Sequence, residues 1–255
     1  DMRGLYFGGR VTRELLRDPL SYIFCLCTPM AMQLLFFLIW YNMPGAARDH
    51  MTIFRADTLA PGIAYFGFSF IMLFASLLLS RDRSTAFLTR LYATPMSAAD
   101  FLIGYALPLF VLGIGQMILT FSLAAILGAV GGTPLTFVGT LRAVLALLPS
   151  LVFFIGVGLL FGALLSQNAA PGLVSVVITL SCVMGGVWMP LEDMPKLERV
   201  FSVLPFVHGV RLARGAYRGG AEHFGLHLGV TLTAAVLAAA VAILAMHLAR
   251  RRETH

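Results

Sequence analysis

The sequence predicts an all-α membrane protein, a single domain over residues 1–255 with six transmembrane helices. Hydrophobic residues make up 59% and charged residues 12% of the chain, and the mean hydropathy is +0.88. Ordinary soluble domains carry about 25% charged residues. Six apolar runs each approach the ~20 residues that cross a bilayer: 22–41, 59–79, 101–127, 143–165, 171–189 and 228–249. We expect a multi-pass membrane protein in contact with lipids.

The segment before the first run, residues 3–18, has the pattern of a helix that lies in the membrane interface. Val11 and Leu15 share one helical face. The basic residues share another face: Arg10, Arg13 and Arg17. Arginines on one side and apolar residues on the other are typical of interfacial helices.

The apolar runs contain no Asp, Glu, Lys or Arg in their cores. Charges inside spans mark ion pathways, so their absence counts against an ion-coupled carrier or a charged pore. Amides, hydroxyls and aromatic rings that suit a bulky apolar or amphipathic cargo are the candidate path residues: Gln33, Phe37, Phe66, Phe70, Gln116, Thr179 and Met184. Each is equally compatible with a packing role. Gly158 and Gly162 form a small-xxx-small pattern, which predicts close helix packing.

Six spans place both termini on the same side of the membrane. Four basic residues precede the first run, three lie in 80–100 and three follow the last run, whereas the loops 42–58 and 128–142 together hold three. Basic residues gather in cytoplasmic segments, so we expect both termini in the cytoplasm. Residues 190–227 lie outside on this topology and still hold five basic residues, which weakens the argument. The excess of basic residues thus reports orientation, and no nucleic acid is expected as a partner.

The segment 80–100 is a polar island between two spans. Phe87 and Leu91 fall on one side of a helix, and Arg83 and Arg90 fall on another. Pro95 ends the helix, because the residue before a proline is disfavoured in the helical region. This pattern predicts a short amphipathic helix on the membrane surface.

The island resembles the first cytoplasmic loop of ABC-2 type exporter permeases, in the order Asp82-Arg83, Arg90-Leu91 and Ala93-Thr94-Pro95. In that family the loop forms a coupling helix that docks on a separate ATPase. The chain has Ala86-Phe87 where the family often has Gly-Thr. The resemblance implies a set of ATPase-coupling residues: Asp82, Arg83, Phe87, Arg90, Leu91, Thr94 and Pro95. An ordinary surface connector helix is the alternative.

The connection 190–227 resembles the segment before the last helix of the same family. The similar residues are Pro190, Glu192, Met194, Pro195, Pro205, Arg211 and Arg214. In that family, and in the related G-subfamily exporters, this segment folds as a re-entrant pair of short helices on the outer side. An outer amphipathic loop is the alternative.

The chain lacks the phosphate cradle that ATP hydrolysis needs. That cradle has the form Gly-x-x-x-x-Gly-Lys-Ser/Thr, and the single lysine, Lys196, follows Met194-Pro195 without such glycines. We therefore expect no cofactor on this chain, with ATP and Mg held by a partner ATPase. His223 and His227 lie four residues apart, which alone is weak evidence for a metal site.

These observations predict the permease subunit of an ABC exporter. The family implies two ATPase subunits and a second copy of this chain or of a related permease. A hydrophobic drug or antibiotic is the first choice of cargo, followed by a lipid. The Arg-rich, Lys-poor composition favours a bacterial cytoplasmic membrane.

One alternative is a membrane enzyme acting on lipids, with its acids and histidines at Glu192, Asp193, Glu198, His208, Glu222 and His223. Another is a structural partner in a membrane complex.

Overall fold

The computed structural model describes residues 2–17, 23–85, 98–191, 194–220 and 223–253. All regular elements within these residues are helical. In chain order they are α1 (Met2–Leu16), η1 (Ile23–Cys27), α3 (Thr28–Tyr41), α4 (Gly45–His50), η2 (Thr52–Phe54), α5 (Ala56–Ser84), α7 (Ala98–Val130), α8 (Phe137–Leu164), α9 (Ala170–Met184), α10 (Pro195–Phe201), α11 (Pro205–Arg218) and α12 (Phe224–Glu253).

Five helical stretches are long and apolar enough to cross a membrane: Ile23–Tyr41, Ala56–Ser84, Asp100–Val130, Phe137–Leu164 and Phe224–Leu248. The predicted fifth span is shorter, because α9 has 15 residues. A helix of that length rises about 22 Å, less than the ~30 Å of a hydrocarbon core. The chain leaves α9 at Gly185 and Gly186, and Gly186 has a φ of 63°, which glycine adopts at little cost.

Helix α5 is the centre of the bundle. Its apolar stretch is 83% buried, whereas the other four are 28–50% buried. Helix α8 packs closely on α5, since an added Cβ at Gly158 would lie 2.5 Å from the Met72 carbonyl oxygen. An added Cβ at Gly162 would lie 2.8 Å from the Ser76 carbonyl oxygen. The predicted packing role of this glycine pair is confirmed.

Helix α1 forms as the sequence predicts, and its apolar face contacts protein. Val11 is fully buried and Leu15 is 8% exposed. An added Cβ at Gly8 would meet the Gly104 carbonyl oxygen at 3.4 Å, so α1 lies close against α7. The two glycines allow this contact, and Val11 and Leu15 on the apolar face are covered by the rest of the protein.

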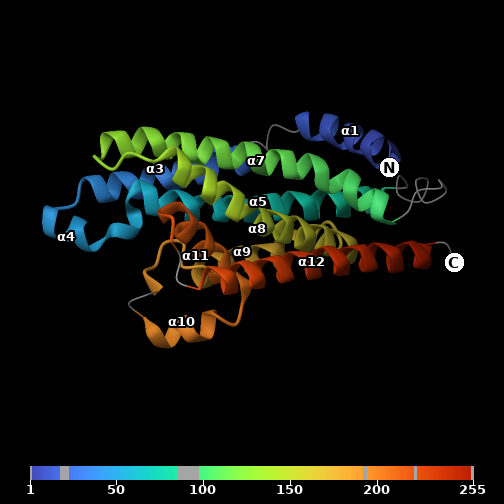
Figure 1. The fold of residues 1–255 in the computed structure, drawn as a ribbon. Helices are drawn as coiled ribbons and strands as arrows, with labels where there is room; N and C mark the ends of the chain where they lie inside the picture. The colour runs from blue at the N-terminus through green and yellow to red at the C-terminus, as the bar shows by residue number, and fades with distance from the viewer. Residues whose placement is uncertain (1, 18–22, 86–97, 192–193, 221–222, 254–255) are drawn as a thin grey trace.

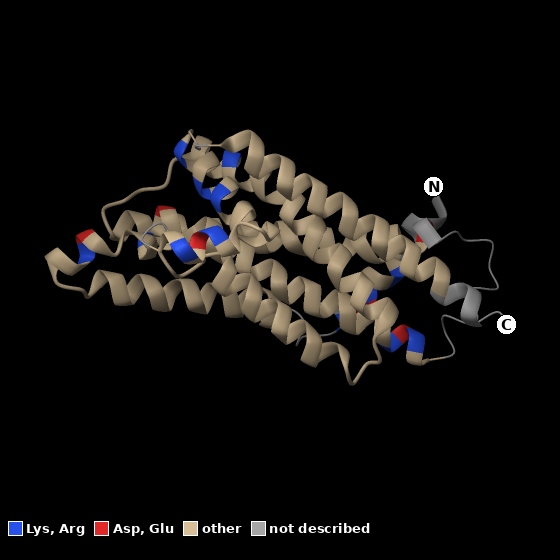
Figure 2. Ribbon diagram, turned by 90° about the horizontal axis from the view of Figure 1, so that it is seen from below, with Lys and Arg blue, Asp and Glu red and all other residues tan. Residues whose placement is uncertain are grey.

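The long helices run side by side, and the bundle has two different ends (Figure 1). One end carries α1, the end of α5 and the end of α12, and we call it the terminal end. The other carries α4, α10 and α11, and we call it the hairpin end. Figure 2 shows the charged residues gathered toward these two ends, with uncharged helix between them. Each end therefore carries its own set of charged side chains.

The connection 190–220 contains the predicted pair of short helices. Pro195 begins α10 and Pro205 begins α11, where a missing N–H costs nothing. Helix α11 packs against α8, α12 and α5, with Phe206, Val207 and Val210 buried. Helix α10 has no buried residue. One helix of the pair thus enters the bundle and the other stays at its edge (Figure 1).

Candidate functional site

At the terminal end, Asp82 is buried inside the bundle. It lies in the last turn of α5 and is 4% exposed. The Tyr105 hydroxyl of α7 donates a hydrogen bond to its carboxylate at 2.6 Å, and Arg10 Nη1 of α1 lies 3.7 Å from the same oxygen. A buried carboxylate is tolerated only with such partners. Asp82 therefore joins α1, α5 and α7.

A second acid strengthens the contact between α1 and α5. Arg81 forms an ion pair with Glu14, and Arg10 also lies 3.5 Å from Glu14. Together with Arg13 and Arg17, these side chains line an open hollow of about 680 Å³. The predicted basic face of α1 thus borders a polar hollow beside the end of α5.

Arg83 connects the end of α5 to the end of α8. Its Nη1 donates to the carbonyl oxygens of Gly162 at 3.2 Å and Leu165 at 3.4 Å. These are among the last carbonyl groups of α8, which have no partner within the helix. A cation at this position also interacts favourably with the helix dipole. Four helices, α1, α5, α7 and α8, are thus linked through the last turn of α5.

The predicted coupling residues fall into two groups. Phe87, Arg90, Leu91, Thr94 and Pro95 lie outside the described residues. Asp82 and Arg83 belong to α5, which extends through Ser84 and so continues past the predicted start of the surface segment at residue 80. The helix continues because tertiary partners satisfy both side chains. Asp82 faces the bundle interior, so it positions the end of α5.

The predicted path residues differ in burial. Gln33 is fully buried, and its amide has no hydrogen-bond partner among the described residues. Gln116 is also buried and donates to Thr120 at 3.0 Å. Phe37 and Phe66 are buried, and Phe70 and Met184 are half-buried. Thr179 is exposed and donates to the Ser175 carbonyl group at 3.0 Å.

An aromatic cluster surrounds Phe66 near the hairpin end. Trp188 lies edge-on to Phe66 with ring centroids 5.1 Å apart, and Phe36 lies 5.5 Å from Trp188. Phe36 also stacks on Phe54 at 5.0 Å. The sequence patterns did not single out Trp188, which falls at the end of the predicted span 171–189, or Phe54, which falls in the predicted loop 42–58.

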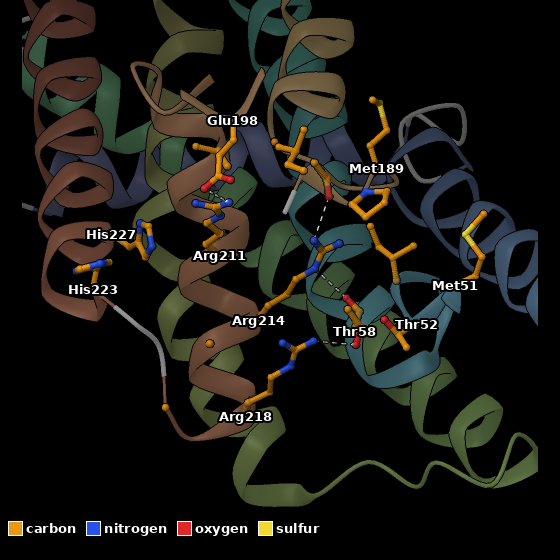
Figure 3. Close-up of a pocket in the computed structure, with 18 of the residues that line it drawn as sticks. Met51, Thr52, Thr58, Met189, Glu198, Arg211, Arg214, Arg218, His223 and His227 are labelled. Atoms are coloured by element: carbon orange, nitrogen blue, oxygen red, sulfur yellow. Dashed lines mark hydrogen bonds and ion pairs between the residues drawn. The ribbon is translucent and has the colours of Figure 1, made fainter. Parts of the chain in front are cut away.

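The hairpin-end arginines have three kinds of partner (Figure 3). Arg211 forms an ion pair with Glu198 of α10 at 2.7 Å. Arg214 donates to the carbonyl oxygens of Thr58, Gly186 and Val187 at 2.9 to 3.1 Å. Arg218 donates to the Thr58 hydroxyl at 3.3 Å. Thr58 therefore connects α11 to the first turn of α5.

These arginines border a cavity of about 660 Å³. Its wall also includes residues from η2, the 185–191 segment and the start of α12. His227 lines it and lies with its Nδ1 atom 2.7 Å from Nδ1 of His208. His223 directly precedes α12 with a φ of 56° and lines the same cavity.

Of the residues of the enzyme alternative, Glu198 and His223 line the hairpin-end cavity. Glu198 pairs with Arg211, and His208 pairs with His227. Glu192, Asp193 and Glu222 lie outside the described residues. Within the described ranges, no group of three or more His, Cys, Asp or Glu side chains could hold a metal ion.

Sequence reasoning missed Glu14, Arg81, Tyr105 and Thr58 as site residues. Glu14 is the acid among the arginines of α1, and Tyr105 lies one turn into an apolar run, which are weak signals. Thr58 carries no distinctive pattern. Only the tertiary fold shows which partner each of these side chains meets.

A comparison with protein families finds one match. The family model described as ABC-2 type transporter matches residues 7–218, which include every described helix except α12 and the first residues of α1. A comparison with curated proteins finds no match.

Proposed function

The chain belongs to the ABC-2 type transporter family and is a membrane permease of an ABC transporter, and from this premise we propose that it exports a hydrophobic or amphipathic cargo using ATP hydrolysed by a separate ATPase subunit. The missing Gly-x-x-x-x-Gly-Lys-Ser/Thr sequence supports the separate ATPase, since this chain has no phosphate cradle of its own.

In this proposal the terminal end faces the cytoplasm of a bacterial cell. Helix α1, the last turn of α5 and the end of α12 lie at that end, and the segments 1–21, 80–100 and 250–255 of the sequence carry most of the basic residues outside 190–227. The positive-inside rule supports this orientation. The hairpin end then faces outward.

The observation that carries the proposal is the link between four helices at the end of α5. Residues 86–97 directly follow α5, whose last turn contacts α1 and α7 through Asp82 and α8 through Arg83. An ATPase that docks on 86–97 would therefore move the end of α5 and, with it, the helices around the bundle centre.

Two copies of the permease, each with one ATPase, complete the proposed transporter. Cargo enters from the inner leaflet or the cytoplasm and leaves past α10 and α11. The exposed apolar side chains on α7, α8 and α12 support contact with lipid or with a second permease. The aromatic cluster at Phe66 and Trp188 and the buried amide of Gln33 are candidate cargo contacts.

The test is a mild-detergent pull-down of this chain from its native membranes, followed by mass spectrometry. The proposal expects an ATPase with the phosphate-cradle sequence in a near-equal amount, and a complex mass that fits two permeases with two ATPases. Recovery of the chain alone under several gentle conditions would contradict it.

A further inference from the structure

We propose that the cavity at the hairpin end binds the anionic head group of an amphipathic molecule, with a phosphate as the best-fitting anion. The cavity lies between α11, η2, the 185–191 segment and the start of α12 (Figure 3). This inference deepens the proposed function by naming a ligand class. It rests on the proposed function in one respect only, namely that the bound ligand is the transported cargo.

The charge of the cavity wall favours an anion. Arg211, Arg214 and Arg218 are spaced three and four residues apart on α11, which places them on one side of the helix. The one acid among the described lining residues is Glu198. Among the described lining residues, three arginines against one carboxylate give a formal charge of +2 in a partly enclosed space. Screening by water is weaker there than on an open surface.

The partners of these arginines assign them different roles. Arg214 directs its guanidinium toward three backbone carbonyl oxygens, which holds it in place as a fixed charge. Arg211 shares its charge with Glu198, and Arg218 makes a 3.3 Å hydrogen bond to Thr58. A guanidinium presents five donors in a fork that matches phosphate oxygens. We assign direct contact with the anion to Arg211 and Arg218.

The position and size of the cavity fit a lipid-like ligand. Thr58 lies in the first turn of α5, and His223 directly precedes α12, so the cavity lies at the ends of two membrane-spanning helices. This is the depth of bilayer head groups. Ile53, Leu191 and Val207 add apolar wall beside the arginines. The volume of about 660 Å³ lies within the ~300–1,000 Å³ typical of ligand pockets.

The experiment measures binding to the purified chain in a non-ionic detergent by isothermal titration calorimetry. Three probes separate the contributions of head and tail: dioctanoyl phosphatidic acid, dioctanoyl phosphatidylcholine and glycerol 3-phosphate. We expect phosphatidic acid to bind at least about tenfold more tightly than phosphatidylcholine, because the tails are the same and the choline of phosphatidylcholine cancels the charge of its phosphate and covers one of its oxygens. If glycerol 3-phosphate binds as tightly as phosphatidic acid, the site belongs to a free phosphate. If glycerol 3-phosphate binds more weakly than phosphatidic acid, the site belongs to a lipid.

Three variants locate the site. Arg218→Gln should weaken phosphatidic acid binding about tenfold through the loss of a charged donor. Glu198→Gln should tighten it about threefold, because it frees Arg211 and raises the cavity charge. Arg199→Gln is the matched control, since it removes one charge from an exposed position of α10 that does not line the cavity.

Equal binding of the two lipids, or equal weakening by Arg218→Gln and Arg199→Gln, would overturn the proposal. Unfolding cannot imitate the result, because Glu198→Gln is expected to tighten binding. The measurement needs no ATPase, so its failure leaves the pull-down test of the proposed function unaffected. A failed pull-down likewise leaves the binding result standing.

Discussion

The two ends of the bundle use the same residue, arginine, with different partners. At the terminal end, Arg10 and Arg81 pair with the carboxylates of Asp82 and Glu14, which come from other helices. At the hairpin end, Arg214 bonds backbone carbonyl groups, and Glu198 is the one acid among the described residues that line the cavity. The first arrangement links helices through their side chains, whereas the second holds an arginine against the backbone beside a cavity.

In our proposals, the two ends of the chain serve two different functions. Ion pairs between helices suit an end that must pass a movement from one helix to the next. A cavity with excess positive charge suits an end that holds a ligand. The partner of each arginine, more than the arginine itself, determines what that end can do.

The largest expected effect tests whether Arg214 is structural. Arg214→Ala removes three hydrogen bonds from a charged donor, so we expect the free energy of unfolding to fall by about 3 kcal/mol. Arg218→Ala, which removes one long hydrogen bond of an exposed side chain, should cost less than about 0.5 kcal/mol. Denaturation in mixed SDS micelles measures both. Equal losses would remove the distinction between the fixed and the ligand-binding arginine.

The next effect tests the buried acid at the terminal end. Asp82→Ala removes the hydrogen bond from the Tyr105 hydroxyl and one of the ion pairs of Arg10, so we expect a loss of about 2 kcal/mol. Asp82→Asn keeps an acceptor oxygen for Tyr105 and should lose less. The same SDS titration compares the two variants. An unchanged stability in Asp82→Ala would mean that this carboxylate does not hold α1, α5 and α7 together.

A smaller effect is expected where α5 meets the end of α8. Arg83→Ala removes two long hydrogen bonds to carbonyl groups, with an expected loss of about 1 kcal/mol. The loss should be local, with faster hydrogen exchange at the amides that follow α8. Mass spectrometry of peptides across 160–170 would detect it. Unchanged exchange there would show that Arg83 does not stabilise the end of α8.

The smallest effect belongs to the exposed ion pair of Arg81 and Glu14. The Arg81 side chain is 42% exposed, so Arg81→Glu should reduce stability by less than about 0.5 kcal/mol. The charge swap Arg81→Glu with Glu14→Arg should restore most of the loss. A double-mutant cycle in low salt measures the coupling. If the swapped pair is less stable than either single variant, the two side chains do not act as a pair.

The sequence could predict the membrane fold, because long apolar runs have few alternatives to spanning helices. It also predicted the α10–α11 pair and the packing role of Gly158 and Gly162. It could not predict that α5 continues through Ser84. Asp82 and Arg83 are polar, and a sequence without contacts places such residues at a surface; only α1, α7 and α8 supply the partners that bury them.

The candidate sites were less predictable. The spacing of His223 and His227 gave no sign that His227 meets His208 from α11. The cavity depends on Thr58, which comes from a distant part of the chain, and on the turn at Gly186. Contacts between segments so far apart in sequence leave no local pattern to find.

The most direct test of the division between the two ends compares ATPase recovery among variants in the mild-detergent pull-down. If residues 86–97 dock the ATPase, the variants Arg90→Glu and Leu91→Asp should insert in the membrane normally but lose the ATPase. Arg199→Glu, an equal charge reversal at the hairpin end, should retain the ATPase in wild-type amount. Retention of the ATPase by Arg90→Glu and Leu91→Asp, or equal loss from Arg199→Glu, would contradict the account.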